Sequence, residues 1–93
     1  MLLIEWKHNA ILDLIEILDY ISQRNPIAAD KLEQTINEAV EKLAESPYSA
    51  RLGRVDGTRE KIAHPNYIIV YRVFTDKIEI LNIVHSSRNY PNI

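Results

Sequence analysis

The chain has 93 residues, of which 46% are hydrophobic and 26% are charged, and its formal net charge is −2. These values fit one globular domain spanning residues 1–93 and exclude a second domain. The absence of cysteine excludes disulfide bonds and cysteine-based metal or nucleophile chemistry. The first residues do not resemble a signal peptide, and no apolar run approaches the roughly 20 residues of a membrane span. We therefore expect a cytoplasmic protein that does not cross a membrane.

A short strand and an amphipathic helix are predicted at the start of the chain. Residues 2–6 are apolar, rich in strand-forming types and too few for a helix. Asn9 is a candidate cap for the helix that follows, which ends near Gln23 or Arg24. The apolar stripe of this helix comprises Ile11, Leu14, Ile15, Leu18 and Ile21, and the acidic side chains of Asp13, Glu16 and Asp19 face the other way.

A second helix is predicted between two clear boundary signals. Asn25 is a good N-cap, and Pro26 suits the first helical position, where its missing N–H costs nothing. The helix ends at Ser46, because the residue before Pro47 is biased away from helical angles. Its apolar stripe comprises Leu32, Ile36, Ala39, Val40 and Leu43. The very short connection between the two helices predicts an antiparallel hairpin.

Three strands are predicted in the second half of the chain, after an irregular segment that holds Gly53 and Gly57. Residues 58–63 alternate between two faces, with Thr58, Glu60 and Ile62 on the same one. Residues 67–74 are almost continuously apolar, which is typical of a central strand covered on both faces. Residues 78–85 form the last strand. Short turns join the three strands, so we expect an antiparallel meander.

The predicted fold is α+β with the order β-α-α-β-β-β. The helical hairpin packs on one face of a four-stranded, mainly antiparallel sheet, in which the first strand lies beside the last. The other face is expected to stay partly open and to carry much of the basic half of the chain. The residues expected to be largely buried are Leu14, Leu18, Leu32, Ile36, Leu43, Ile69, Tyr71, Ile80 and Ile83. Truncating Leu18 or Ile36 to alanine is expected to cost about 2–5 kcal/mol.

Charge is distributed unevenly along the chain. Residues 1–50 carry a net charge of −5, and residues 51–93 carry +3. The basic half holds Arg51, Arg54, Arg59, Lys61, Arg72 and Arg88, together with His64, His85, Tyr67, Tyr71 and Tyr90. Arginine, histidine and tyrosine together can bind phosphate, stack on bases and move protons without a metal. From the pattern alone, ordinary surface charges and tyrosines at the edge of the core explain these residues better.

Other chemistries find little support in the sequence. His8, His64 and His85 are far apart and match no metal-binding spacing, so we expect no metal and no cofactor. The neighbouring Ser86 and Ser87 do not make a catalytic triad, because adjacency in sequence is not triad geometry. The two glycines match no phosphate-binding loop.

Several short motifs in the second half occur together in one known group of proteins. They are the glycine–arginine pair at Gly53, the run from Thr58 to Glu60, the strand "NYIIVYR", and "VHSSRNYP" near the end. With these motifs and its predicted element order, the chain resembles the RelE/ParE superfamily of toxins from bacterial type II toxin–antitoxin systems, over essentially its whole length. The resemblance implies a growth-inhibiting toxin, in a family associated with plasmid stabilisation, that a cognate antitoxin wraps and neutralises in a hetero-oligomer.

Two features place the chain nearer the ParE-like branch, whose members inhibit DNA gyrase, than the RelE-like mRNA endonucleases that act on the ribosome. RelE-like proteins commonly have an arginine where this chain has Ile68, and they tend to be strongly basic, whereas the isoelectric point here is near 5.9. Residues that would contact the target are Arg54, Arg59, His64, His85, Arg88 and Tyr90. We assign no catalytic residue; in a nuclease the set would be Arg59, Arg72, His85, Arg88 and Tyr90. A third alternative is a non-toxic member that only binds an antitoxin.

Overall fold

The protein is described by a computed structural model that covers residues 1–88 and 90–91. The elements along these residues are β1 (Leu3–Trp6), α1 (His8–Ser22), α2 (Pro26–Glu45), β2 (Arg51–Leu52), β3 (Arg59–His64), β4 (Tyr67–Val73) and β5 (Lys77–His85). The predicted α+β fold and element order are confirmed. The sheet has five strands where four were expected, because the short β2 pairs with β3 in the segment predicted to be irregular.

The strands follow the order β1-β5-β4-β3-β2 across the sheet. The first strand does lie beside the last, and it runs parallel to it, with Leu3 opposite Lys77 and Trp6 opposite Ile80. All other neighbouring pairs are antiparallel. β4 is therefore a central strand, as its continuous apolar run predicts.

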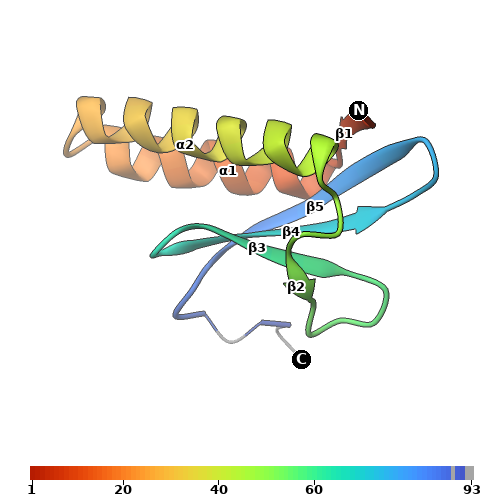
Figure 1. Cartoon of the computed structure of the whole chain (residues 1–93). Coiled ribbons are helices and arrows are strands. Elements are labelled where there is room, and N and C mark those ends of the chain that lie inside the picture. The colour runs from red at the N-terminus through yellow and green to blue at the C-terminus, as the bar shows by residue number, and fades with distance from the viewer. Residues whose placement is uncertain (89, 92–93) are drawn as a thin grey trace.

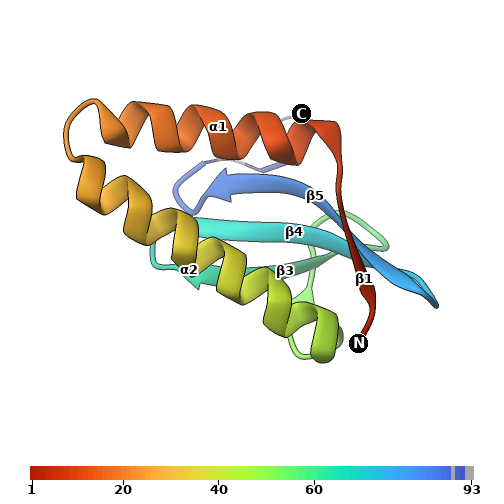
Figure 2. The ribbon, with the colours of Figure 1, turned by 90° about the horizontal axis from the view of Figure 1, so that it is seen from above.

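Both helices cover the same face of the sheet (Figures 1 and 2). Seen from above, α1 runs along β5 and α2 crosses β4 and β3. The cap of α2 is as predicted, since the Asn25 side chain accepts a hydrogen bond from the Ala28 N–H at 3.1 Å. The cap of α1 was predicted wrongly: the helix already begins at His8, and Lys7 at the N-cap makes no capping bond with its side chain. Neither helix is long and apolar enough to cross a membrane.

The core lies between the helices and the sheet. Seven of the nine residues expected there are buried, namely Leu32, Ile36, Leu43, Ile69, Tyr71, Ile80 and Ile83. Leu14 and Leu18 are only partly buried, although they pack against the same cluster. The buried Tyr71 also joins the sheet to the end of α2, because its hydroxyl donates to the Pro47 carbonyl at 2.6 Å.

The face assigned to α1 from its sequence was partly wrong. Ile11 and Ile15 are 42% and 57% exposed, and Ile17 packs against the core instead. Asp13 does not face solvent but points at β5, where a bulge shifts the register between Val70 and Tyr71. Its carboxylate accepts the Ile83 N–H at 3.0 Å and the Asn82 amide at 3.1 Å. The helix is therefore rotated so that one acid serves the bulge and two isoleucines face outward.

The sheet face opposite the helices is not open as expected. Ile68, Val70 and Val84 are each at most 4% exposed, and Leu81 and Tyr90 pack against them. Figure 1 shows the described residues after β5, 86–88 and 90–91, returning beneath the sheet on this side. The centre of this sheet face is thus covered. Exposed apolar side chains lie on α1, at Ile11, Leu12, Ile15 and Tyr20, and on β1, β2 and β3, at Leu3, Leu52 and Ile62.

Candidate functional site

The basic residues near β2 are organised around one buried acid. Glu60 on β3 is 2% exposed, and its carboxylate accepts hydrogen bonds from Arg51 at 3.1 Å and from the Arg54 guanidinium at 3.1 and 3.3 Å. The Arg54 backbone N–H adds a third partner at 2.8 Å. We call Glu60, Arg51, Arg54 and Tyr90 the Glu60 cluster, because the Tyr90 ring lies 5.3 Å from the Arg54 guanidinium carbon.

Electrostatics in the Glu60 cluster favour the ionised acid. Burial by itself would raise the pKa of Glu60, but the hydrogen bonds from Arg54 and Arg51 together outweigh it and hold the pKa below its usual value. The single negative carboxylate offsets one of the two guanidinium charges, which leaves the ion-paired group with a net charge of +1. Arg51 and Arg54 therefore stabilise this end of the sheet and offer less positive charge to an anionic ligand than their number suggests.

Tyr90 belongs to the covering of the sheet more than to a reactive centre. Burial, and next the negative charge of Glu60, raise the pKa of its hydroxyl, so the group stays protonated at neutral pH. Arg72 lies on the same sheet face, and its Nε donates only a long contact of 3.4 Å to the Gly57 carbonyl. Of the residues named from the sequence, Arg54, Arg72 and Tyr90 therefore do converge.

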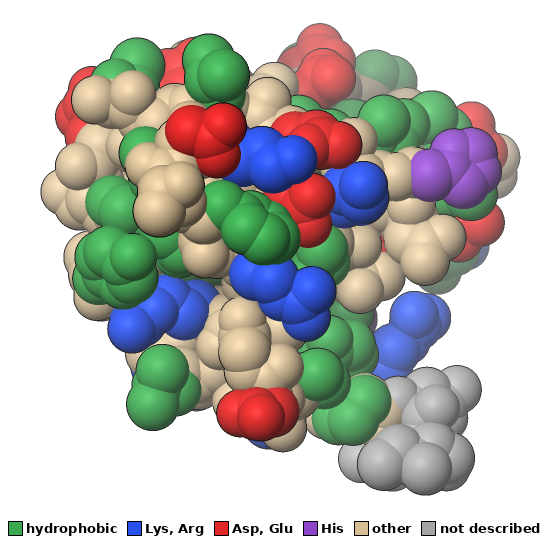
Figure 3. Space-filling model, turned by 90° about the vertical axis from the view of Figure 1, so that its right-hand side faces the viewer, with side chains coloured by type: hydrophobic (Ala, Val, Ile, Leu, Met, Phe, Trp, Pro, Cys, Tyr) green, Lys and Arg blue, Asp and Glu red, His purple; other side chains and the backbone are tan. Residues whose placement is uncertain are grey.

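Arg59 lies apart from this cluster, because neighbouring residues of a strand face opposite sides. Its guanidinium donates to the Ala50 carbonyl at 2.8 Å and to the Tyr48 carbonyl at 3.4 Å, and it lies over the Tyr48 ring at 5.0 Å. A hollow of about 310 Å³ opens beside these two side chains. On the face shown in Figure 3, lysine and arginine are scattered among acidic and hydrophobic side chains and form no continuous basic patch.

The two histidines lie at the other end of the central strands, in a row with Tyr67. The Tyr67 ring is 5.9 Å from the His64 ring and 5.2 Å from the His85 ring. The Nδ1 of His64 accepts the Asn66 N–H at 3.0 Å, and the Nδ1 of His85 accepts the Ser87 N–H at 3.1 Å. Each neutral ring must therefore carry its proton on Nε2. The Nδ1 atom of each ring is thereby engaged within its own turn.

Distance separates the two groups of residues. His85 is opposite Tyr67, and Arg72 lies five residues further along β4, which corresponds to about 16 Å. Arg88 is near His85, since its N–H donates to the His85 carbonyl at 3.0 Å. The candidate nuclease set is thus split between both ends and both faces of the sheet. Within the described residues, no group of three or more potential metal ligands comes together.

Sequence reasoning assigned no role to the two residues that organise these groups. Glu60 looked like one of several strand charges, and Tyr67 was grouped with the histidines of the basic half but was assigned to no site. One signal for Glu60 was available, because it shares an alternating face with Thr58, which is also buried. A charged residue on a buried face needs a partner. Arg59 is adjacent but faces the other side of the strand, so Arg54 and Arg51 are the next cations back along the chain.

Comparison with known proteins gives consistent matches. The family model described as "ParE toxin of type II toxin-antitoxin system, parDE" matches residues 4–90. Y4kP of Sinorhizobium fredii is 41% identical over 91 residues, which cover 97% of this chain and 94% of that protein. Toxin RelE2 of Caulobacter vibrioides is 36% identical over 83 residues, which cover 89% and 93%.

Two solved structures share the fold. The chromosomal ParDE system from P. aeruginosa contains a chain with a TM-score of 0.80 and 28% identity, over 91% of this chain and 96% of that one. The solution structure of HP0894 from Helicobacter pylori has a TM-score of 0.65 over 95% and 98% of the two chains. Because the two sequences are only 18% identical, this match shows a likeness of fold alone.

Proposed function

Because the chain belongs to the ParE toxin family of type II toxin–antitoxin systems, we propose that it inhibits DNA gyrase without cutting nucleic acid and that a cognate antitoxin neutralises it. Gyrase is the target expected from the ParE-like branch that the sequence resembles. The proposal also assigns the protein to the cytoplasm, where DNA and its topoisomerases are found.

The observation that carries the proposal is the separation of the residues a nuclease would need. Cleavage of RNA without a metal requires a base for the 2′-hydroxyl and cations at the same phosphate. Here the only candidate imidazole at β5, His85, has its Nδ1 engaged by Ser87 and lies about 16 Å from Arg72. This arrangement favours a protein that acts by binding.

The surroundings of Ile68 support the same reading. RelE-like proteins commonly have an arginine here, whereas Ile68 is 4% exposed and packs with Val70, Val84 and Tyr90. An arginine at this place would bring an unpaired charge into an apolar cluster, which is costly. Where the RelE-like pattern has an arginine, this chain therefore has a packed apolar layer.

The test is a gyrase supercoiling and DNA-cleavage assay with folded protein freed of antitoxin. We expect loss of supercoiling and accumulation of cleaved DNA. Arg88→Ala and Arg72→Ala are the first variants, since Arg88 is exposed and Arg72 makes one long hydrogen bond among the described residues. Full gyrase activity in the presence of excess folded protein would refute the proposal.

A parallel assay distinguishes the endonuclease alternative. Translating ribosomes, mRNA and the same protein sample are incubated together, and RNA ends are mapped. We expect intact mRNA. Cleavage within codons that is lost in His85→Ala, but kept in His8→Ala as a matched surface control, would assign the protein to the RelE-like mechanism. Inactivity in both assays, with no growth defect in cells, would identify a non-toxic antitoxin-binding member.

We assign antitoxin binding to the outer side of α1. Ile11, Leu12 and Ile15 are between 42% and 57% exposed and neighbour each other on the helix. A contiguous apolar stripe of this kind on a small soluble domain suits an amphipathic partner segment. We expect Ile11→Glu combined with Ile15→Glu to abolish rescue by the antitoxin while toxicity remains. Glu16→Gln on the same helix is the control, and equal loss of rescue there would contradict the assignment.

A further inference from the structure

One edge of the sheet is only half covered. β2 pairs with β3 through Arg51 opposite Glu60, and the Gly53 N–H donates to the Thr58 carbonyl at 2.8 Å. In the same register Ala50 would lie opposite Lys61, and the next hydrogen-bonded pair of this antiparallel ladder would be Ser49 opposite Ile62. The Ser49 N–H instead donates to the Ser46 carbonyl at 3.2 Å. The covering strand therefore stops before the middle of β3.

This leaves Ile62 with an unpaired backbone on the outer edge. Strand residues alternate in the side to which their N–H and C=O point, so Thr58, Glu60 and Ile62 all face outward. The first two meet β2, and for Ile62 the described residues provide no such neighbour. Its side chain is 53% exposed. An open edge with an exposed β-branched residue is suited to pairing with another strand.

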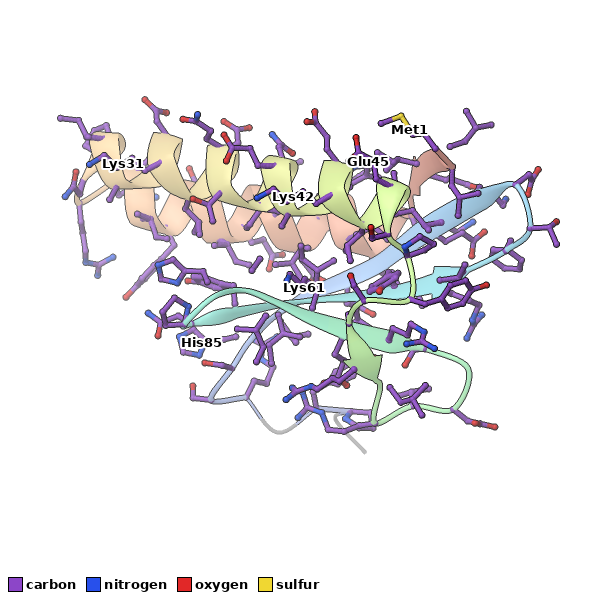
Figure 4. The ribbon with its side chains drawn as sticks, viewed as in Figure 1. Met1, Lys31, Lys42, Glu45, Lys61 and His85 are labelled. Atoms are coloured by element: carbon purple, nitrogen blue, oxygen red, sulfur yellow. The ribbon has the colours of Figure 1, made fainter. Side chains whose placement is uncertain are left out.

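Two hollows flank this edge and make it accessible. The first hollow, of about 250 Å³, lies towards α2, and its lining includes Thr35, Lys42 and Ala63. The second, of about 220 Å³, lies towards β2, and its lining includes Ala50. Both are lined by Lys61 and Ile62. The two hollows adjoin at Lys61 and Ile62, and we call the two together the β3 groove. Lys42 and Lys61 extend from α2 and β3 on the same side of the molecule (Figure 4).

The charge of the β3 groove is positive. Among the described residues, neither Lys42 nor Lys61 has an ion-pair partner. Glu60 is buried and already bonded to Arg51 and Arg54, so it contributes little negative charge to the groove. Glu38 is the other acid in the lining, and its carboxylate accepts a hydrogen bond from the neutral Gln34 amide at 3.0 Å. With Arg51, Lys42 and Lys61 against Glu38 and Glu60, the lining keeps a net charge of +1.

We propose that the β3 groove binds an extended, acidic segment of a partner protein, which adds a strand to the sheet at Ile62. Backbone hydrogen bonds to β3 would supply affinity, and carboxylates facing Lys42 and Lys61 would supply specificity. A second copy of this chain fits less well, because pairing two β3 edges would bring the lysines of both copies together. The proposal concerns a different surface from α1 and does not depend on which target the toxin inhibits.

The test uses a blocked peptide that alternates glutamate and valine, with a lysine–valine peptide as the matched control. Binding to the full chain is followed by amide NMR and hydrogen exchange. We expect the acidic peptide to shift the amide signals of Lys61, Ile62 and Ala63 and to slow exchange of the Ile62 N–H. The lysine–valine peptide should not bind.

Two kinds of variant separate backbone pairing from charge. Ile62→Pro removes the outward N–H at a position where proline is tolerated, and it should abolish binding, whereas Ile62→Val should bind like the original chain. Lys61→Glu and Lys42→Glu should each lower the affinity for the acidic peptide about threefold to fivefold, which is the size of effect typical of exposed ion pairs. The two lysine variants leave the β3 backbone unchanged, so they still test the proposal if Ile62→Pro fails to fold.

Several results would overturn the proposal. These are equal binding of the two peptides, no binding of the acidic peptide, signal changes on α1 in place of β3, or unchanged binding by the two lysine variants. Concentration-dependent dimers that disappear in Ile62→Pro would assign the edge to a second copy of the chain instead.

Discussion

Replacing Asp13 with alanine should destabilise the protein more than the loss of a charged side chain from a helix usually does. The Asp13 carboxylate accepts the Ile83 N–H and the Asn82 amide, and Ile83 is 2% exposed. Losing the acceptor leaves a buried N–H unsatisfied, which costs about 1–3 kcal/mol, and a second bond to a charged group adds to that. We expect the free energy of unfolding to fall by about 2–4 kcal/mol, out of the roughly 5–15 kcal/mol typical of such a domain.

Asp19→Ala is the matched control. It makes the same change on the same helix, where the carboxylate is exposed and accepts one long bond from Gln23 at 3.3 Å. Both variants gain the same helix propensity, up to about 0.7 kcal/mol, so the difference between them isolates the contacts with β5. Urea unfolding followed by fluorescence of Trp6, the single tryptophan, measures both. Equal stability of the two variants would refute the role assigned to Asp13.

Further predictions concern the core, the buried acid and one glycine. Ile36→Ala should cost about 2–5 kcal/mol, and Leu18→Ala about half as much because Leu18 is only partly buried, both measured by urea unfolding. Because the pKa of Glu60 is lowered from 4.5, its stabilising effect is complete above that pH and is lost as the pH falls through the lowered value. Thermal melting between neutral and acid pH should therefore show a smaller acid-induced loss in Glu60→Gln than in the original chain. Gly53→Ala should destabilise by about 1–3 kcal/mol, since its new Cβ would clash with the buried Thr58, and a melting temperature like that of the original chain would contradict this.

Periodicity was enough to predict the second helix and the central strands. The α2 stripe of Leu32, Ile36 and Leu43 recurs at helical spacing, and all three are buried. The α1 stripe was predicted partly wrongly, because apolar residues occupy well over half of the circumference of this helix. Ile11 and Ile17 are then equally plausible core residues, and only packing against β5 decides between them. The Asp13 carboxylate accepts the Ile83 N–H at the β5 bulge, and this contact favours the rotation of α1 that places Ile17 in the core.

By itself the sequence determined the element order, the helical hairpin, the central position of β4 and the chain's resemblance to toxins of toxin–antitoxin systems. These follow from local spacing, caps and short motifs. Only the tertiary structure decided which functional candidates meet. Strand register places Arg72 about 16 Å from His85 and Arg59 on the face opposite Glu60. Long-range pairing also buries Glu60 among arginines and ends β2 before Ile62, because contacts between distant segments depend on where each strand aligns.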